Sequence, residues 1–194
     1  MDKKRVAIFA SGSGSNAMNL IQHFKGHSSI EVAFVLTNNS NAGIIEKAEG
    51  VGVKTIVMSN AEVAQGDVLN NLCNEENITW IVLAGYLRLV PADFIDSYEN
   101  RIINLHPALL PKFGGKGMFG QHVHHAVVES GETESGITIH FVNSEFDKGR
   151  IIAQFRCSVN TEDTALDVDR KIRILEQSYL PAVVEKTILN SDLL

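Results

Sequence analysis

Apolar residues along the chain are arranged in a pattern that predicts strands alternating with helices. Short continuous apolar runs, such as those at 6–10 and 80–84, are typical of strands buried on both faces. Between the runs, apolar positions recur at helical spacing. We expect strands at 6–10, 30–36, 54–58, 80–84 and 102–105, and helices at 17–24, 44–51, 61–77 and 91–98.

The second part of the chain continues differently. Four glycines between 112 and 121 indicate a loop, and a helix is expected at 122–130. Two adjacent strands follow, with a turn between them, and a long helix closes the chain. We expect the strands at 137–142 and 150–159, the turn at 143–149 and the helix at 164–190, with Asp163 as the N-cap of this helix.

This order of elements predicts the fold class α/β: a single-domain Rossmann-like three-layer sandwich covering 1–194. The sheet should be mostly parallel, with an antiparallel late strand contributed by the final hairpin. In such sheets, ligands bind beyond the carboxyl ends of the strands. Asn16, Arg88, Asn104 and His106 all fall at or beyond such ends.

Charge and cysteine content narrow the class of protein. The net charge of −6 argues against a broad nucleic-acid surface, although a local pocket could still bind a small anion. The two cysteines, Cys73 and Cys157, form no CxxC pattern, which fits a reducing compartment. No signal peptide or membrane span is visible, so we expect a soluble cytoplasmic protein with no membrane or nucleic-acid partner.

A strand end carries the most informative side chains. Asn104 and His106 lie two positions apart, so on an extended strand they point to the same side. Pro107 and Pro111 then fix the chain beyond them. An amide donor and a titratable ring held together can stabilise an oxyanion and move a proton. The alternative is that both side chains only satisfy loop backbone groups.

A glycine-rich loop follows the first strand. Gly14, Ser15 and Asn16 open a helix, whose N-terminus presents free N–H groups to an anion. No acidic residue for a ribose occurs at 36–40, and no P-loop Lys-Ser/Thr pair is present, which favours a single phosphate over NAD or ATP. The alternative is a tight turn without a ligand.

Other polar residues are ambiguous by themselves. Asp147 lies in a hairpin turn, where Asp is common for structural reasons alone. The alternative is that its carboxylate lies beside His106, where it would orient the ring and favour imidazolium. Arg88 is either a solvated surface residue or an anion or ring contact. Glu176 would by itself be a solvated helix position. The histidines at 122, 124 and 125 are weak candidates for a metal site, and we expect none.

Together, four motifs resemble those of the phosphoribosylglycinamide formyltransferase family, folate-dependent enzymes of purine synthesis. They are Ser-Gly-Ser-Gly-Ser-Asn at 11–16, Leu-Ala-Gly-Tyr-Leu-Arg at 83–88, Asn-Leu-His-Pro-Ala-Leu-Leu-Pro at 104–111, and His-Phe-Val with Asp-Lys-Gly between 140 and 149. The resemblance covers essentially the whole chain. One departure is the glycine-rich loop at 112–121, which is shorter in many family members; we expect a mobile lid or an altered cofactor entrance there.

The resemblance implies a role for each matching residue. Catalysis would fall to Asn104, His106 and Asp147; substrate binding to Gly14, Ser15, Asn16 and Glu176; cofactor binding to Arg88, Leu89, Val90 and Val142; and lining of the site to Thr138 and His140.

The resemblance also implies the reaction. The amine of glycinamide ribonucleotide would attack the formyl carbon of 10-formyltetrahydrofolate, without metal and through a tetrahedral intermediate. Asp147 would keep His106 charged. Three alternatives stay open: a formyltetrahydrofolate hydrolase, a methionyl-tRNA formyltransferase and a non-catalytic nucleotide-binding module. The first two typically carry an additional domain, which we do not expect here. The oligomeric state stays open between monomer and homodimer.

Overall fold

The apolar runs of the chain form the strands of one seven-stranded sheet, in the order β3-β2-β1-β4-β5-β6-β7. The computed structural model describes residues 3–190. β1 to β5 pair in parallel, whereas β6 runs antiparallel to both of its neighbours. The strands are β1 Lys4–Phe9, β2 Ile30–Thr37, β3 Lys54–Val57, β4 Trp80–Leu83, β5 Ile102–His106, β6 Glu134–Phe141 and β7 Ile151–Ser158.

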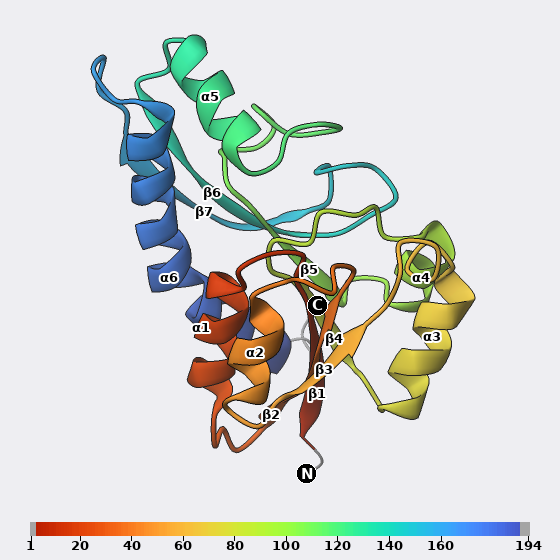
Figure 1. Cartoon of the computed structure of the whole chain (residues 1–194). Coiled ribbons are helices and arrows are strands. Elements are labelled where there is room, and N and C mark those ends of the chain that lie inside the picture. The colour runs from red at the N-terminus through yellow and green to blue at the C-terminus, as the bar shows by residue number, and fades with distance from the viewer. Residues whose placement is uncertain (1–2, 191–194) are drawn as a thin grey trace.

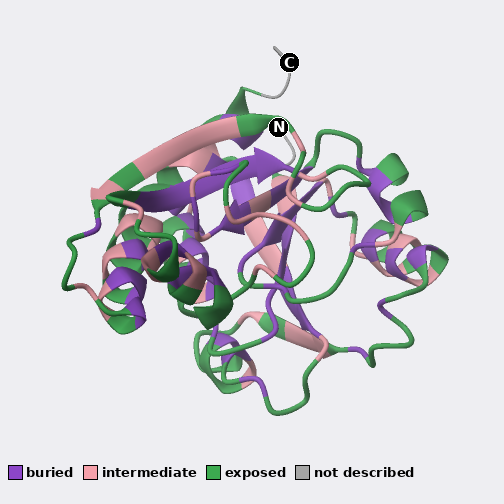
Figure 2. Cartoon of the chain, turned by 90° about the horizontal axis from the view of Figure 1, so that it is seen from above, coloured by how far each residue is buried: buried purple, intermediate pink, exposed green. Residues whose placement is uncertain are grey.

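Helices cover both faces of this sheet, which confirms the predicted three-layer α/β architecture (Figure 1). One buried cluster joins one face to α1, α2, α5 and α6; a second joins the other face to α3 and α4. The strands between these layers are mostly buried, while the helices expose their outer surfaces (Figure 2). The helices are α1 Ser15–Phe24, α2 Ile44–Glu49, α3 Gly66–Glu75, α4 Ala92–Ser97, α5 Gln121–Glu129 and α6 Ala165–Leu189.

Two sequence predictions about helices were wrong in detail. The helix expected at 61–77 begins only at Gly66, because Gln65 has extended backbone angles (φ −107°, ψ 109°) and ends a separate turn. The N-cap of α6 is Thr164 rather than Asp163. Asp163 instead accepts a hydrogen bond from the Asn160 N–H at 2.8 Å, so its carboxylate closes the preceding turn.

The sheet order places the ends of β1 and β4 at a topological switch point. β1 continues toward β2 and β3 on one side, while β4 continues toward β5 on the other. The loops that leave these two strands therefore diverge, and a crevice opens between them. Within residues 3–190, no helix is both long and apolar enough to cross a bilayer.

The cap of α6 makes a testable contribution to stability. The Thr164 hydroxyl accepts from the Asp167 N–H at 3.3 Å, and the Asp167 carboxylate accepts from the Thr164 N–H at 3.0 Å, which completes a capping box. Thr164→Ala should lower the free energy of unfolding by about 1 kcal/mol in urea denaturation. The exposed Thr161 lies outside the helix, so Thr161→Ala is the matched control. Equal losses in both variants would contradict this role of the cap.

Candidate active site

A cavity of about 530 Å³ opens at the carboxyl ends of β1, β4 and β5. Its size lies within the range of roughly 300–1,000 Å³ that is usual for small-molecule sites. The glycine loop, the segment after β4, the end of β5 and the turn between β6 and β7 all line it. The fold thus brings together segments that are far apart in the sequence.

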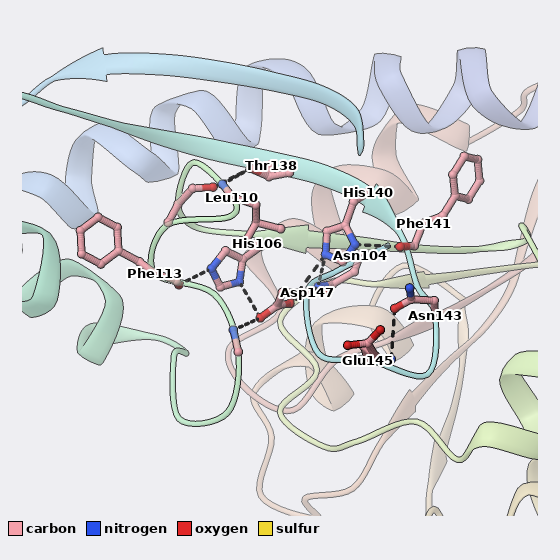
Figure 3. Close-up of polar contacts among 12 residues, drawn as sticks. Asn104, His106, Leu110, Phe113, Thr138, His140, Phe141, Asn143, Glu145 and Asp147 are labelled. Atoms are coloured by element: carbon pink, nitrogen blue, oxygen red, sulfur yellow. Dashed lines mark hydrogen bonds and ion pairs between the residues drawn. The ribbon is translucent and has the colours of Figure 1, made fainter. Parts of the chain in front are cut away.

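Asn104 is oriented by a neighbouring histidine on β6. The Nδ1 of His140 lies 2.8 Å from the Phe141 carbonyl oxygen, which can only accept, so Nδ1 carries the proton in the neutral ring. The Nε2 of His140 is then an acceptor, and the Asn104 Nδ2 donates to it at 3.0 Å (Figure 3). The same Nδ2 is 3.5 Å from Oδ1 of Asp147, so its second N–H faces the carboxylate side of the cavity.

His106 lies between two acceptors. Its Nε2 donates to the Phe113 carbonyl oxygen at 2.8 Å, and its Nδ1 is 3.6 Å from Oδ2 of Asp147 (Figure 3). Asn104 and His106 therefore point to the same side, as their spacing on the strand predicted, and both face the Asp147 carboxylate, which the spacing did not predict. Because Nε2 carries the proton in the neutral ring, Nδ1 is the nitrogen that can accept another one.

The protonation of His106 differs from the expectation. Burial lowers the pKa of His106 below its ordinary 6.5, while the negative charge of Asp147 and the Phe113 carbonyl raise it and the charge of His140 lowers it. The lowering prevails, since only 3% of the residue is exposed. Asp147 thus favours imidazolium as predicted, but it does not keep the ring charged in the free protein at neutral pH.

Asp147 is held in an uncommon conformation by several donors. Its φ of 54° is in the left-handed region, which Asp tolerates better than most residues. Burial raises the pKa of this carboxyl, but a hydrogen bond from His140 in its protonated form, the charge of His106 and the Gly115 N–H together lower it below the ordinary 3.8. The carboxylate is therefore ionised at neutral pH. Its position beside His106 goes beyond the structural turn role that sequence statistics favour.

The glycine loop has the features that were predicted for anion binding. Gly14 caps α1 with a φ of 72°, and a Cβ there would lie 2.5 Å from Ile44 side-chain carbons. Residues of the first turn of α1, Ser15 and Asn16, line the cavity. First-turn N–H groups of a helix have no intrahelical acceptor, so they can bind an anion. Lys47 donates to the Ser13 carbonyl at 2.8 Å and places a positive charge beside the loop.

Glu176 of α6 is not a solvated helix residue. Its carboxylate accepts from the Asn16 Nδ2 at 2.9 Å, and both residues line the cavity. Burial raises the pKa of Glu176, whereas the Asn16 hydrogen bond and the charge of Arg173 oppose the rise. A partly buried acceptor beside the first turn of α1 is suited to bind a hydroxyl group of a ligand.

The opposite wall of the cavity is more apolar. Arg88, Leu89, Val90 and Val142 all line it, as the family resemblance implied, and Leu89 is 56% exposed. Thr138 was expected to line the site, and this was wrong. It is fully buried, and its hydroxyl donates to the Ala108 carbonyl at 2.7 Å because it packs behind the segment after β5.

Some groups at the site were not predicted. The Phe113 carbonyl and the Gly115 N–H contact the catalytic candidates through the main chain, which leaves no mark in side-chain patterns. His124, from the histidine cluster, is buried against Asp169 at 3.3 Å, while His122 and His125 are exposed. In the described part of the chain, no three His, Cys, Asp or Glu residues are placed to hold a metal ion.

Known proteins are similar in sequence to this chain. The formyl transferase family matches residues 4–184. A chloroplastic phosphoribosylglycinamide formyltransferase of Arabidopsis thaliana is 38% identical over 188 residues, covering 94% of this chain and 64% of that protein. Its counterpart in Vigna unguiculata is 38% identical over 189 residues, covering 94% of this chain and 60% of that protein. The chain thus spans less than two thirds of the length of both relatives.

A solved structure agrees with the whole fold. The crystal structure of phosphoribosylglycinamide formyltransferase from Bacillus halodurans has 35% sequence identity and a TM-score of 0.86, covering 98% of this chain and 97% of that chain. Because the family match spans most of the sequence and the architecture agrees, this chain belongs to the formyl transferase family.

Proposed function

We propose that the protein transfers the formyl group of 10-formyltetrahydrofolate to the amine of glycinamide ribonucleotide. The observation that carries this proposal is the grouping of Asn104, His106 and Asp147 in one cavity with an anion-binding helix terminus. The names of the similar proteins support the same reaction. The two free cysteines, Cys73 and Cys157, are compatible with the reducing cytoplasm as the place of this activity.

Each part of the cavity suits one part of the two substrates. The phosphate of the ribonucleotide would bind the N–H groups at Gly14–Asn16, and a ribose hydroxyl would donate to Glu176. The flat folate ring would lie against the apolar wall at 88–90 and 142. This arrangement brings the amine and the formyl carbon together near Asn104, and such proximity can supply roughly 7–11 kcal/mol in well-oriented systems.

The chemical steps follow from the side chains around the reacting carbon. The amine nitrogen attacks the formyl carbon, and the carbonyl electrons move to oxygen. The Asn104 amide N–H that faces Asp147, at the long distance of 3.5 Å, then donates to the oxyanion instead. Nδ1 of His106 accepts the proton that the attacking nitrogen loses, and the nearby Asp147 carboxylate stabilises the resulting imidazolium.

Collapse of the tetrahedral intermediate completes the transfer. The bond between the formyl carbon and N10 of the folate breaks, and the proton held by His106 passes to N10. The products are formylglycinamide ribonucleotide and tetrahydrofolate, and His106 is neutral again. The lowered pKa of His106 suits this cycle, because a ring that is neutral at rest can accept the proton and then release it readily.

Deformylation of 10-formyl-5,8-dideazafolate, followed by absorbance with and without glycinamide ribonucleotide, tests the proposal. We expect deformylation that depends on the ribonucleotide and is unchanged by EDTA, because the Asn104 amide stabilises the oxyanion and His106 accepts the proton. Deformylation without the ribonucleotide would instead indicate a hydrolase. No reaction under either condition would favour a binding module.

Removing a member of the catalytic group should affect turnover and spare binding. Loss of the oxyanion donor in Asn104→Ala should lower kcat on the order of 100- to 1,000-fold. His106→Ala and Asp147→Asn should each abolish most turnover, because the proton then has no acceptor or the imidazolium has no counter-ion. Calorimetric titration with glycinamide ribonucleotide should give nearly wild-type affinity in all three variants. Comparable loss of this affinity would contradict the assigned roles.

The titration of His106 has a predicted direction. Because its pKa is lowered, the ring should stay neutral until the pH falls below about 6.5. Asp147→Asn removes a charge that raises this pKa, so the midpoint should move to still lower pH. Histidine NMR of the free protein measures both values, with the resonance assigned by its loss in His106→Ala. A midpoint above 6.5, or an upward move in Asp147→Asn, would contradict this account.

A further inference from the structure

The glycine-rich loop between β5 and α5 contacts both members of the proposed proton-transfer pair through its main chain. The Phe113 carbonyl accepts from Nε2 of His106 at 2.8 Å (Figure 3). The Gly115 N–H donates to Oδ2 of Asp147 at 2.9 Å. These two loop residues are two positions apart, so a single short segment holds the imidazole and the carboxylate at once.

Only glycine suits two consecutive positions of this segment. A Cβ on Gly114 would lie 2.5 Å from Cδ2 of Leu110 and 3.3 Å from Cβ of Asp147. The loop backbone therefore passes so close to Leu110 and Asp147 that a side chain at position 114 would require both to shift. Gly115 has a φ of 96°, which other residues rarely adopt. The sequence of the loop thus matches the path that keeps it against the carboxylate.

We infer that Gly114 and Gly115 are positioning residues of the reaction, which hold Asp147 and His106 at their working separation through the loop backbone. The inference rests on the proposed function, in which this pair moves the proton. It differs from a lid or cofactor entrance, which would act through side chains that project from the loop, such as Lys116 and Phe119. Here the main chain of the loop is part of the catalytic arrangement.

The two contacts also act together on charge. A carbonyl that accepts from His106 favours imidazolium, and an N–H that donates to Asp147 favours carboxylate. Asp147 is faced by His106 from β5, by His140 from β6 at 3.7 Å, by the neutral Asn104 amide, and by Gly115 from the loop. The loop contacts both His106 and Asp147, and it does so through main-chain atoms that do not titrate.

The chain provides a matched pair of variants. Gly115 and Gly117 lie in the same loop with φ values of 96° and 90°, and a Cβ on either would meet nothing within 4 Å. Alanine therefore imposes the same conformational strain at both positions. Within residues 3–190, however, the Gly117 N–H donates to neither His106 nor Asp147, whereas Gly115 donates to Asp147.

Steady-state kinetics of Gly115→Ala and Gly117→Ala form the first test. Displacement of about 1 Å at a catalytic group can cost on the order of 100-fold in rate. We expect Gly115→Ala to lower kcat by about that factor with little change in KM for either substrate, and Gly117→Ala to stay within a few-fold of the wild type. Gly114→Ala should resemble Gly115→Ala. Equal losses of kcat in the Gly115 and Gly117 variants, or a loss confined to KM, would overturn the inference.

Carboxyl NMR gives a second test that needs no activity. Burial raises the pKa of Asp147 and several contacts, including the Gly115 N–H, lower it. The Asp147 signal, assigned with Asp147→Asn, should therefore titrate at higher pH in Gly115→Ala than in Gly117→Ala or the wild type. An unchanged midpoint would overturn the positioning role. Absence of formyl transfer by the wild type would contradict the proposed function, and this titration would still decide whether the loop holds the carboxylate.

Discussion

The Asp147 carboxylate is the point on which the site depends. It is approached by His106 from the end of β5, by His140 from β6 and by a backbone N–H of the loop that follows β5. These segments come from separate parts of the chain, and the half-buried negative charge is stabilised there by the Gly115 N–H and the Asn104 amide, which both donate to it. The position of one carboxylate therefore fixes the relative positions of the groups proposed to stabilise the oxyanion and to move the proton.

The antiparallel strand β6 makes this arrangement possible. His140 pairs with Asn104 in the register of β5 and β6, so the imidazole can accept from the amide and determine which way it points. A strand that followed β6 and paired with it in parallel would need a long crossover connection after Phe141. Here the chain instead turns directly after β6, and that short turn carries Asp147 back over the end of β5. The one strand that departs from the parallel pattern thus delivers both the orienting histidine and the carboxylate.

Much of this could be predicted from sequence because it is encoded in local side-chain patterns. Continuous apolar runs identified the strands, and the two-residue spacing of Asn104 and His106 placed them together at one strand end. The sequence did not predict the structure correctly where a specific contact, rather than a side-chain pattern, decides which residue plays a role. The choice of Thr164 over Asp163 as a cap depends on which side chain reaches the Asp167 N–H. The neutral state of His106 depends on burial, and the roles of Phe113 and Gly115 depend on main-chain atoms, which every residue possesses.

The buried Thr138 hydroxyl connects the reaction centre with the edge of the molecule. It donates to the Ala108 carbonyl, accepts from the Leu110 N–H, and also accepts from the Gln154 side chain on the edge strand β7. Gln154 in turn donates to the Leu110 carbonyl at 2.9 Å. Thr138, which does not line the cavity, thereby fixes the position of the segment directly after His106 relative to β6. Sequence change along the edge strand β7 can therefore alter the proposed reaction centre indirectly, without any substitution of the residues proposed to perform the chemistry.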